Sequence, residues 1–216
     1  VAIADHLAKN KYDLKALMRL ILRSETYRRS SVPLERNRED QSYYSRYYPR
    51  RMMAEVLYDA IVSVTSVSRR FDNITNFDGS TRKTAFYPEG TRALQLYDSS
   101  VTSYFLKAFG RNDREITCEC ERSNKPSMVQ VLHLSNGNAL NDRLSAKKGR
   151  VSELLAKENS EIIDEIYMLC FSRKPGENAR KRITELFAGT PPEEKRTVVE
   201  DLFWALMTSR EFLFQH

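Results

Sequence analysis

Residues 49–67 read PRRMMAEVLYDAIVSVTSV, and this stretch decides the fold class. Its apolar residues recur three and four positions apart, the spacing that places side chains on one face of an α-helix. The stretch therefore predicts a helix with one broad buried face, made of Met52, Met53, Val56, Leu57, Ala60, Ile61, Val64 and Val67.

Helical spacing continues on both sides of this stretch. Asp13 stands where an N-cap belongs, before a helix whose apolar face is Leu14, Leu17, Met18, Ile21 and Leu22. Further helices are expected from Asp98 or Ser99 to Gly110, and from Gly149, Ser160, Pro175 and Thr190. Thr190 and Glu193 have the spacing of a capping box for the last of them. The chain has only 7 glycines and 7 prolines, few for a fold rich in tight turns.

These patterns predict an all-α, helical bundle-like single domain over residues 1–216, interrupted by one long irregular loop. That loop covers about residues 69–92, where the helical spacing fails. A short hairpin is an option around Asp78 and Gly79. Loops of this length in compact domains tend to be functional or mobile. The strongly apolar C-terminal end is expected to pack onto the domain or onto a partner.

No run approaches the roughly 18 uninterrupted apolar residues that a membrane-spanning helix requires, so none is expected. Residue 1 is a valine inside helical-looking sequence, and we interpret the chain as a piece of a larger multidomain protein. The net charge is +6. Residues 1–51 contain twelve Lys and Arg and six Asp and Glu, so their excess equals that of the whole chain.

Between Tyr27 and Arg51 the positive charge is interleaved with tyrosines. Arginine beside tyrosine can hold phosphates while stacking on bases or sugars, so an Arg/Tyr face that binds an anionic polymer, glycan or nucleic acid, is one interpretation. The other is a solvated surface with the tyrosine rings packed on neighbouring helices. The second is favoured, because no recognisable nucleic-acid-binding motif accompanies the arginines.

The chemically densest stretch is Phe109–Asn141, FGRNDREITCECERSNKPSMVQVLHLSNGNALN. Cys118, Cys120 and His133 offer two thiolates and an imidazole, which suit zinc or copper, so a metal or redox site is a candidate. A single residue between two cysteines in a strand-like segment sends their side chains to opposite faces, which argues against it. A disulfide between Cys170 and one of the pair, or plain burial of the thiols, is the alternative, and burial is favoured.

No catalytic residue is assigned. His133 stands before an expected helix end, where a histidine can satisfy main-chain carbonyls, and no nucleophile can be tied to it. The chain has no CxxCH sequence, so covalent haem is not expected in this domain. Amides beside an arginine can cross-link helices or bind a sugar or carboxylate, which makes Arg122, Asn124, Gln130 and Asn136 candidate binding residues.

The order of several motifs resembles the planctomycete PSD domain over essentially the full chain. They are DLKALMRLILRSETYRRSS near the start, RYYPRRMMAEVLYDAI, the dense stretch, and IYMLCFSRKP with DLFWALMTSREFLF. The resemblance implies a domain of unknown function within a large exported protein, outside the cytoplasm and beside cytochrome-c-like modules. Arg50, Arg51 and Glu55 fall in its RRMMAE pattern, as ion pairs that fix the helix or as ligands for an anion.

The hypothesis from sequence is therefore a non-catalytic interaction or structural module. Its expected partners are other domains of its parent protein, among them a cytochrome-c-like module, reached through the apolar C-terminal helix and the dense stretch. The metal or redox site and the anionic-polymer face are its two alternatives.

Overall fold

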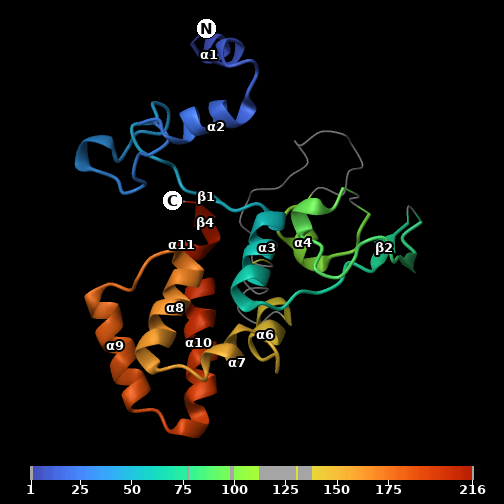
Figure 1. The fold of residues 1–216 in the computed structure, drawn as a ribbon, viewed down its shortest axis with the longest axis vertical. Coiled ribbons are helices and arrows are strands. Elements are labelled where there is room, and N and C mark those ends of the chain that lie inside the picture. The colour runs from blue at the N-terminus through green and yellow to red at the C-terminus, as the bar shows by residue number, and fades with distance from the viewer. Residues whose placement is uncertain (1, 77, 98–99, 112–129, 131–137, 216) are drawn as a thin grey trace. The chain divides into compact units, whose positions relative to one another are not determined.

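The computed structural model describes residues 2–76, 78–97, 100–111, 130 and 138–215. Contacts divide the chain into two compact units, residues 1–50 with 214–216 and residues 51–213. Figure 1 draws both. The chain passes between them at strand β1 (Arg50–Arg51) and at strand β4 (Phe214–Gln215).

The N-terminal unit (residues 1–50 with 214–216) contains two short α-helices, α1 (Ala2–Lys9) and α2 (Leu14–Leu22), and the 3₁₀ helix η1 (Glu35–Asn37). The predicted cap of α2 is confirmed, because the Asp13 carboxylate accepts N–H bonds from Lys15 at 2.9 Å and Ala16 at 3.0 Å. Neither helix contains a buried residue.

The larger unit (residues 51–213) holds the remaining elements. Its helices are α3 (Ala54–Thr65), η2 (Ala93–Gln95), α4 (Tyr104–Ala108), α6 (Asn138–Leu144), α7 (Arg150–Leu154), α8 (Asn159–Phe171), α9 (Glu177–Ala188), η4 (Pro192–Glu194), α10 (Lys195–Met207) and α11 (Arg210–Leu213). Its strands are β2 (Asn73–Thr75) and β3 (Thr81–Lys83).

The hydrophobic core of the larger unit forms around α3 and α10. Helix α10 contacts α6, α7, α8 and α11, and α3 contacts α4, η2, α6 and α7. Apolar residues at helical spacing fill the space between them, as the sequence pattern of α3 predicts. The largest of the fully buried side chains are Leu57, Ile61, Leu106, Leu140, Leu154, Ile162, Ile163, Ile166, Val199, Phe203 and Met207.

Close backbone packing explains one glycine. A Cβ atom at Gly149 would lie 2.8 Å from Val67 Cγ2 and 3.2 Å from the Thr65 carbonyl oxygen. Real Cβ atoms essentially never show the first of these distances, so a side chain at residue 149 would force Val67 or the start of α7 to shift.

Strands β2 and β3 form an antiparallel hairpin with Asn73 opposite Lys83 and Thr75 opposite Thr81. The hairpin that the sequence offered around Asp78 and Gly79 is confirmed, and Gly79 has the positive φ of 81° that such turns favour in glycine. The all-α prediction is too strict, because the structure is mainly helical with small antiparallel strands.

Two predicted helix starts are wrong. Helix α4 begins only at Tyr104 and its cap is Ser103, whose side chain accepts the N–H of Leu106, while Asp98 and Ser99 lie outside the described residues. The Thr190 hydroxyl donates to the Leu186 carbonyl at 2.6 Å, so Thr190 completes the end of α9 and does not cap the following helix. Along the described ranges, no helix has the length and apolar character needed to cross a membrane.

Candidate functional site

The predicted metal site lies outside the described residues, since Cys118, Cys120 and His133 all fall in residues 112–129 or 131–137. Among the residues that are described, no group of three His, Cys, Asp or Glu side chains is placed to hold a metal ion. Cys170 carries a free thiol on α8, and burial raises its pKa to about 12. A buried thiol of this kind behaves as a small apolar side chain that packs in the core.

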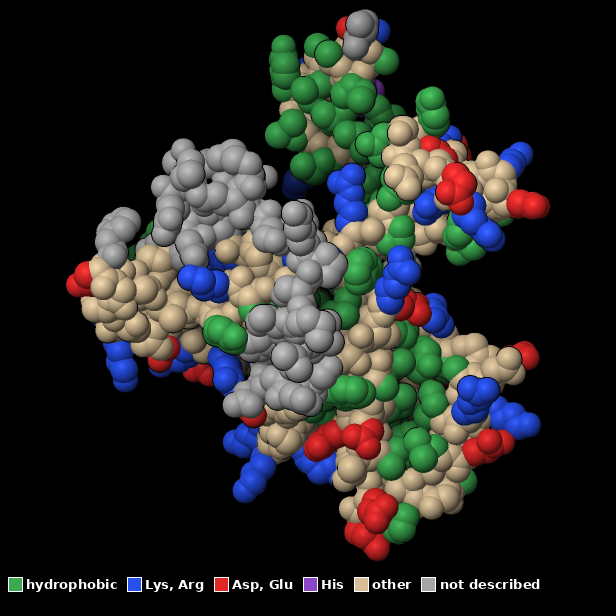
Figure 2. Space-filling view, turned by 180° about the vertical axis from the view of Figure 1, so that it is seen from behind, with side chains coloured by type: hydrophobic (Ala, Val, Ile, Leu, Met, Phe, Trp, Pro, Cys, Tyr) green, Lys and Arg blue, Asp and Glu red, His purple; other side chains and the backbone are tan. Residues whose placement is uncertain are grey.

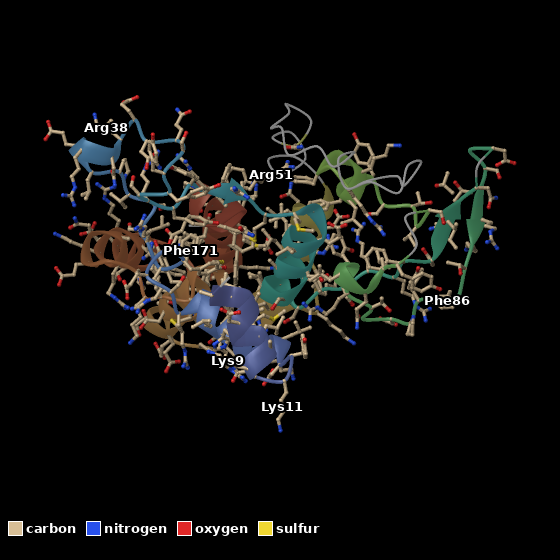
Figure 3. All side chains as sticks on the ribbon, turned by 90° about the horizontal axis from the view of Figure 1, so that it is seen from above. Lys9, Lys11, Arg38, Arg51, Phe86 and Phe171 are labelled. Carbon is tan, nitrogen blue, oxygen red and sulfur yellow. The ribbon has the colours of Figure 1, made fainter. Side chains whose placement is uncertain are left out.

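Three of the predicted binding residues meet at the end of α4. Arg51, labelled in Figure 3, donates from its Nη2 atom to the Phe109 carbonyl oxygen at 3.0 Å. Gln130 Nε2 donates to the Ala108 carbonyl oxygen, also at 3.0 Å. Both side chains satisfy carbonyls that a helix C-terminus leaves without intrahelical partners.

Glu55 joins the same place from the first turn of α3. Its Oε1 atom lies 3.7 Å from Arg111 Nε, and the two side chains are only 7% and 9% exposed. A carboxylate in the first turn of a helix is favoured by the helix dipole, and burial strengthens its attraction to the arginine. We call Arg51, Glu55, Arg111 and Gln130 the α3–α4 polar cluster.

This cluster ties the start of α3 to the end of α4. The Arg51 guanidinium also lies 5.7 Å from the centre of the Phe109 ring, which itself stacks on Phe105 at 4.3 Å. The polar side chains of the cluster thus bind main-chain carbonyls or a carboxylate. Buried polar groups with such partners can hold two helices together.

The sequence analysis did not single out two largely buried arginines, Arg111 and Arg143. Arg111 has its partner 56 positions earlier in the chain, at Glu55, so no local pattern could identify the pair. Arg143 is 3% exposed, donates from Nε to the Val67 carbonyl at 3.1 Å and lies 4.9 Å from the centre of the Tyr58 ring. Burial lowers the pKa of the Arg143 guanidinium.

The remaining predicted binding residues are Arg50, Arg122, Asn124 and Asn136. Arg50 is exposed and belongs to the N-terminal unit. Arg122, Asn124 and Asn136 lie outside the described residues.

The C-terminal apolar segment is not a free docking surface. Val199, Phe203, Met207 and Phe212 are all buried in the core of the larger unit, while Trp204 is 37% exposed. The expectation that this end packs onto the domain is confirmed for these four side chains. These four side chains are therefore unavailable to a partner, and the proposed docking of the rest of the segment stays a prediction.

An exposed apolar surface is found instead on the N-terminal unit. Hydrophobic side chains gather over α1 and α2 (Figure 2). We define the N-terminal apolar face as the six large aliphatic side chains of these helices that are 41–60% exposed, which are Ile3, Leu14, Met18, Leu20, Ile21 and Leu22. From residue 2 to residue 50 no side chain is buried. Contiguous apolar surface of this kind marks interaction sites.

A loop rich in arginine and tyrosine follows α2 in the same unit. The Asp40 carboxylate shapes it by accepting N–H bonds from Ser42 at 2.9 Å, Tyr43 at 2.8 Å and Ser45 at 3.0 Å. These bonds and one from the Ser45 hydroxyl lower the Asp40 pKa. Tyr43 is 87% exposed, so the solvated-packing interpretation does not describe its ring.

Two arginines also contact tyrosines of this loop. Arg29 donates from its guanidinium to the Tyr44 carbonyl oxygen. The Arg46 guanidinium lies 5.0 Å from the centre of the Tyr48 ring. The loop thus presents tyrosine rings and cations together at the surface of the N-terminal unit.

Comparison with protein-family models gives one match. Residues 2–187 match PSD1, described as a protein of unknown function (DUF1553). The chain belongs to the PSD1 family. The resemblance to a planctomycete PSD domain is thereby confirmed. No curated protein and no solved structure matches the chain.

The residues that match the family model end before the folded core of this PSD1 chain does. The matched residues end within α9, yet α10 lies beyond them and supplies Val199, Phe203 and Met207 to the core. The α1–α2 pair, in contrast, lies inside the match although it adds nothing buried.

The larger unit of this PSD1 chain also has an open hollow of about 560 Å³ beside α3. Arg69 and Arg92 line it, but Arg69 pairs with Asp142 and Arg92 lies 3.5 Å from Asp59. The Asp59 carboxylate in turn accepts the N–H of Ala93 at 2.7 Å, at the start of η2. These charged side chains therefore stabilise the residues that line the hollow, and they do not indicate a particular ligand.

Proposed function

We propose that this PSD1 chain is a non-catalytic binding module of a larger exported protein, and that the N-terminal apolar face is its docking element. The observation that carries the proposal is the contrast between buried and exposed apolar helix faces. Those of α3 and α10 are buried in the core, whereas that of α2, with the same spacing, is exposed.

Helix α2 has nine residues and α1 has eight. Isolated helices shorter than about 12–15 residues are marginal in water, and most helical stability in proteins comes from packing an apolar face. An external surface that covers the N-terminal apolar face would therefore stabilise both helices. In the parent protein we propose an extracytoplasmic setting, in which neighbouring domains, such as a cytochrome-c-like module, are further partners of the chain.

A matched pair of leucine substitutions tests the proposal. Leu14→Ala removes a side chain that is 59% exposed, and Leu57→Ala removes one that is 0% exposed. Urea unfolding followed by the fluorescence of Trp204, the only tryptophan, should show a loss of about 2–5 kcal/mol for Leu57→Ala. Leu14→Ala should stay within about 0.5 kcal/mol of wild type, because surface substitutions rarely cost more.

The proposal would be wrong if the triple variant Leu14→Ala, Met18→Ala and Ile21→Ala destabilised the larger unit as much as Leu57→Ala does. Such a result would show that these side chains serve the chain's own core. Alanine keeps the helix propensity high, so loss of helix would not confuse the comparison.

A further inference from the structure

The side chains of α2 divide into two faces. At about 100° per residue, Leu14, Met18, Ile21 and Leu22 fall within about 100° of one another around the helix, and Leu17 and Leu20 extend this apolar arc to about 200°. Lys15 and Arg19, together with Arg23 just after the helix, fall within the next 80° or so. The cations therefore border the apolar side chains along one edge.

The charge around α2 is strongly positive. From Lys9 to Arg29 there are seven Lys and Arg against two acidic residues, Asp13 and Glu25. The Asp13 carboxylate caps α2, and Glu25 lies 3.8 Å from Arg28. Within the described part of the chain, Lys15, Arg19 and Arg23 form no ion pair. Figure 3 shows Lys11 pointing away from the helices.

We propose that the N-terminal unit binds an anionic phospholipid surface. This inference rests on the proposed function and names the occupant of the N-terminal apolar face. Leu14, Met18 and Ile21 enter the boundary between headgroups and acyl chains, and the bordering Lys and Arg lie at the lipid phosphates. Apolar residues on one face with Lys and Arg on the other are typical of helices that lie in the membrane interface.

Two observations favour this occupant. A second copy of the chain would bring the same cations against one another, and like charges facing each other across an interface are costly. The unit also exposes Tyr43 and Tyr44, and tyrosine is enriched at membrane interfaces, where its ring is buried and its hydroxyl stays wet.

The proposed binding needs both kinds of side chain. The binding of an amphipathic helix to a membrane increases both with its buried apolar area and with its electrostatic attraction to anionic lipids. Each Lys or Arg near an anionic surface contributes about one further factor of five in binding, so three contribute about a hundredfold.

The test is sedimentation of the full chain with phosphatidylcholine vesicles that contain 30% phosphatidylserine or none. Wild type should bind the anionic vesicles at least tenfold more tightly than the neutral ones. Lys15→Gln with Arg19→Gln and Arg23→Gln should weaken that binding about a hundredfold. The triple alanine variant at Leu14, Met18 and Ile21 should also weaken it at least tenfold.

The matched control removes three exposed cations elsewhere, by Lys147→Gln, Lys148→Gln and Lys181→Gln. It has the same net charge as the α2 charge variant and should bind anionic vesicles within about threefold of wild type. Equal losses in the two variants would reduce the effect to net charge and overturn the lipid site.

The remaining outcomes separate the lipid inference from the proposed function. Failure of wild type to bind anionic vesicles, with the triple alanine variant as stable as wild type, would overturn the lipid site and leave the binding module intact. A dimer in light scattering that the alanine variant abolishes would assign the face to a second copy. Tight heparin binding that the alanine variant leaves unchanged, without vesicle binding, would assign the cations to a soluble polyanion. Loss of stability in the alanine variant would overturn the proposed function itself.

Discussion

The buried ion pair of the α3–α4 polar cluster gives the sharpest prediction for the larger unit. Glu55→Ala would remove a carboxylate from beside the guanidinium of Arg111, in a site where that side chain is 9% exposed. Breaking a buried pair by removing one partner typically costs about 3–5 kcal/mol. Most domains have only about 5–15 kcal/mol of stability, so the loss is a large fraction of the total.

Urea unfolding measured by circular dichroism gives the free energy directly. Glu185→Ala is the matched control, because Glu185 is an exposed glutamate within α9, and it should change the free energy of unfolding by no more than about 0.5 kcal/mol. Glu55→Leu combined with Arg111→Met should cost less than Glu55→Ala, because no uncompensated charge remains.

A Glu55→Ala variant as stable as Glu185→Ala would refute this account of the cluster. Equal losses from Glu55→Ala and from the double variant would also refute it, because the penalty would then not come from an unpaired charge. The first of these outcomes would leave the arginines better explained as ligands for an anion than as parts of the fold.

Two further predictions concern the larger unit. Gly149→Ala should lower the free energy of unfolding in urea by about 1–3 kcal/mol, because its Cβ would meet Val67 Cγ2 at 2.8 Å. Gly176→Ala is the control, because a Cβ there would meet nothing within 4 Å. A loss for Gly149→Ala no larger than that of the control would contradict the close packing. In a Cys118→Ser, Cys120→Ser background, Cys170 should react with a disulfide reagent at pH 8 at least a hundredfold more slowly in the folded chain than in urea. The reason is that burial raises the Cys170 pKa to about 12 from an ordinary value near 9, so that little thiolate is present in the folded chain. Equal rates in the folded and unfolded chain would contradict the buried thiol.

Local signals in the sequence predicted local structure well. Asp13 caps α2, the hairpin forms around Gly79, and Gly110 has a positive φ of 91° at the predicted helix end. Each of these depends on one residue and its near neighbours. Thr190 is the exception. The sequence predicted that it caps the following helix, but its hydroxyl donates to a carbonyl of the preceding helix, α9.

Long-range features could not be predicted in the same way. The apolar spacing of α2 is as regular as that of α3, yet α3 is buried and α2 is not, because burial depends on what packs against a helix. Glu55 was singled out by the RRMMAE pattern, but its partner Arg111 is distant in sequence. The charge excess of residues 1–51 pointed to a special surface without showing that apolar side chains share it.

Amide hydrogen exchange of the free chain tests the central claim most directly, which is that α1 and α2 present a face for binding and do not belong to the core. Helices without buried side chains open at little cost in free energy, whereas core helices open only at a cost close to that of global unfolding. Amides of residues 2–22 should therefore exchange within seconds at neutral pH, while those of α3 and α10 stay protected for hours. Protection of α2 equal to that of α3 in the free chain would contradict the account.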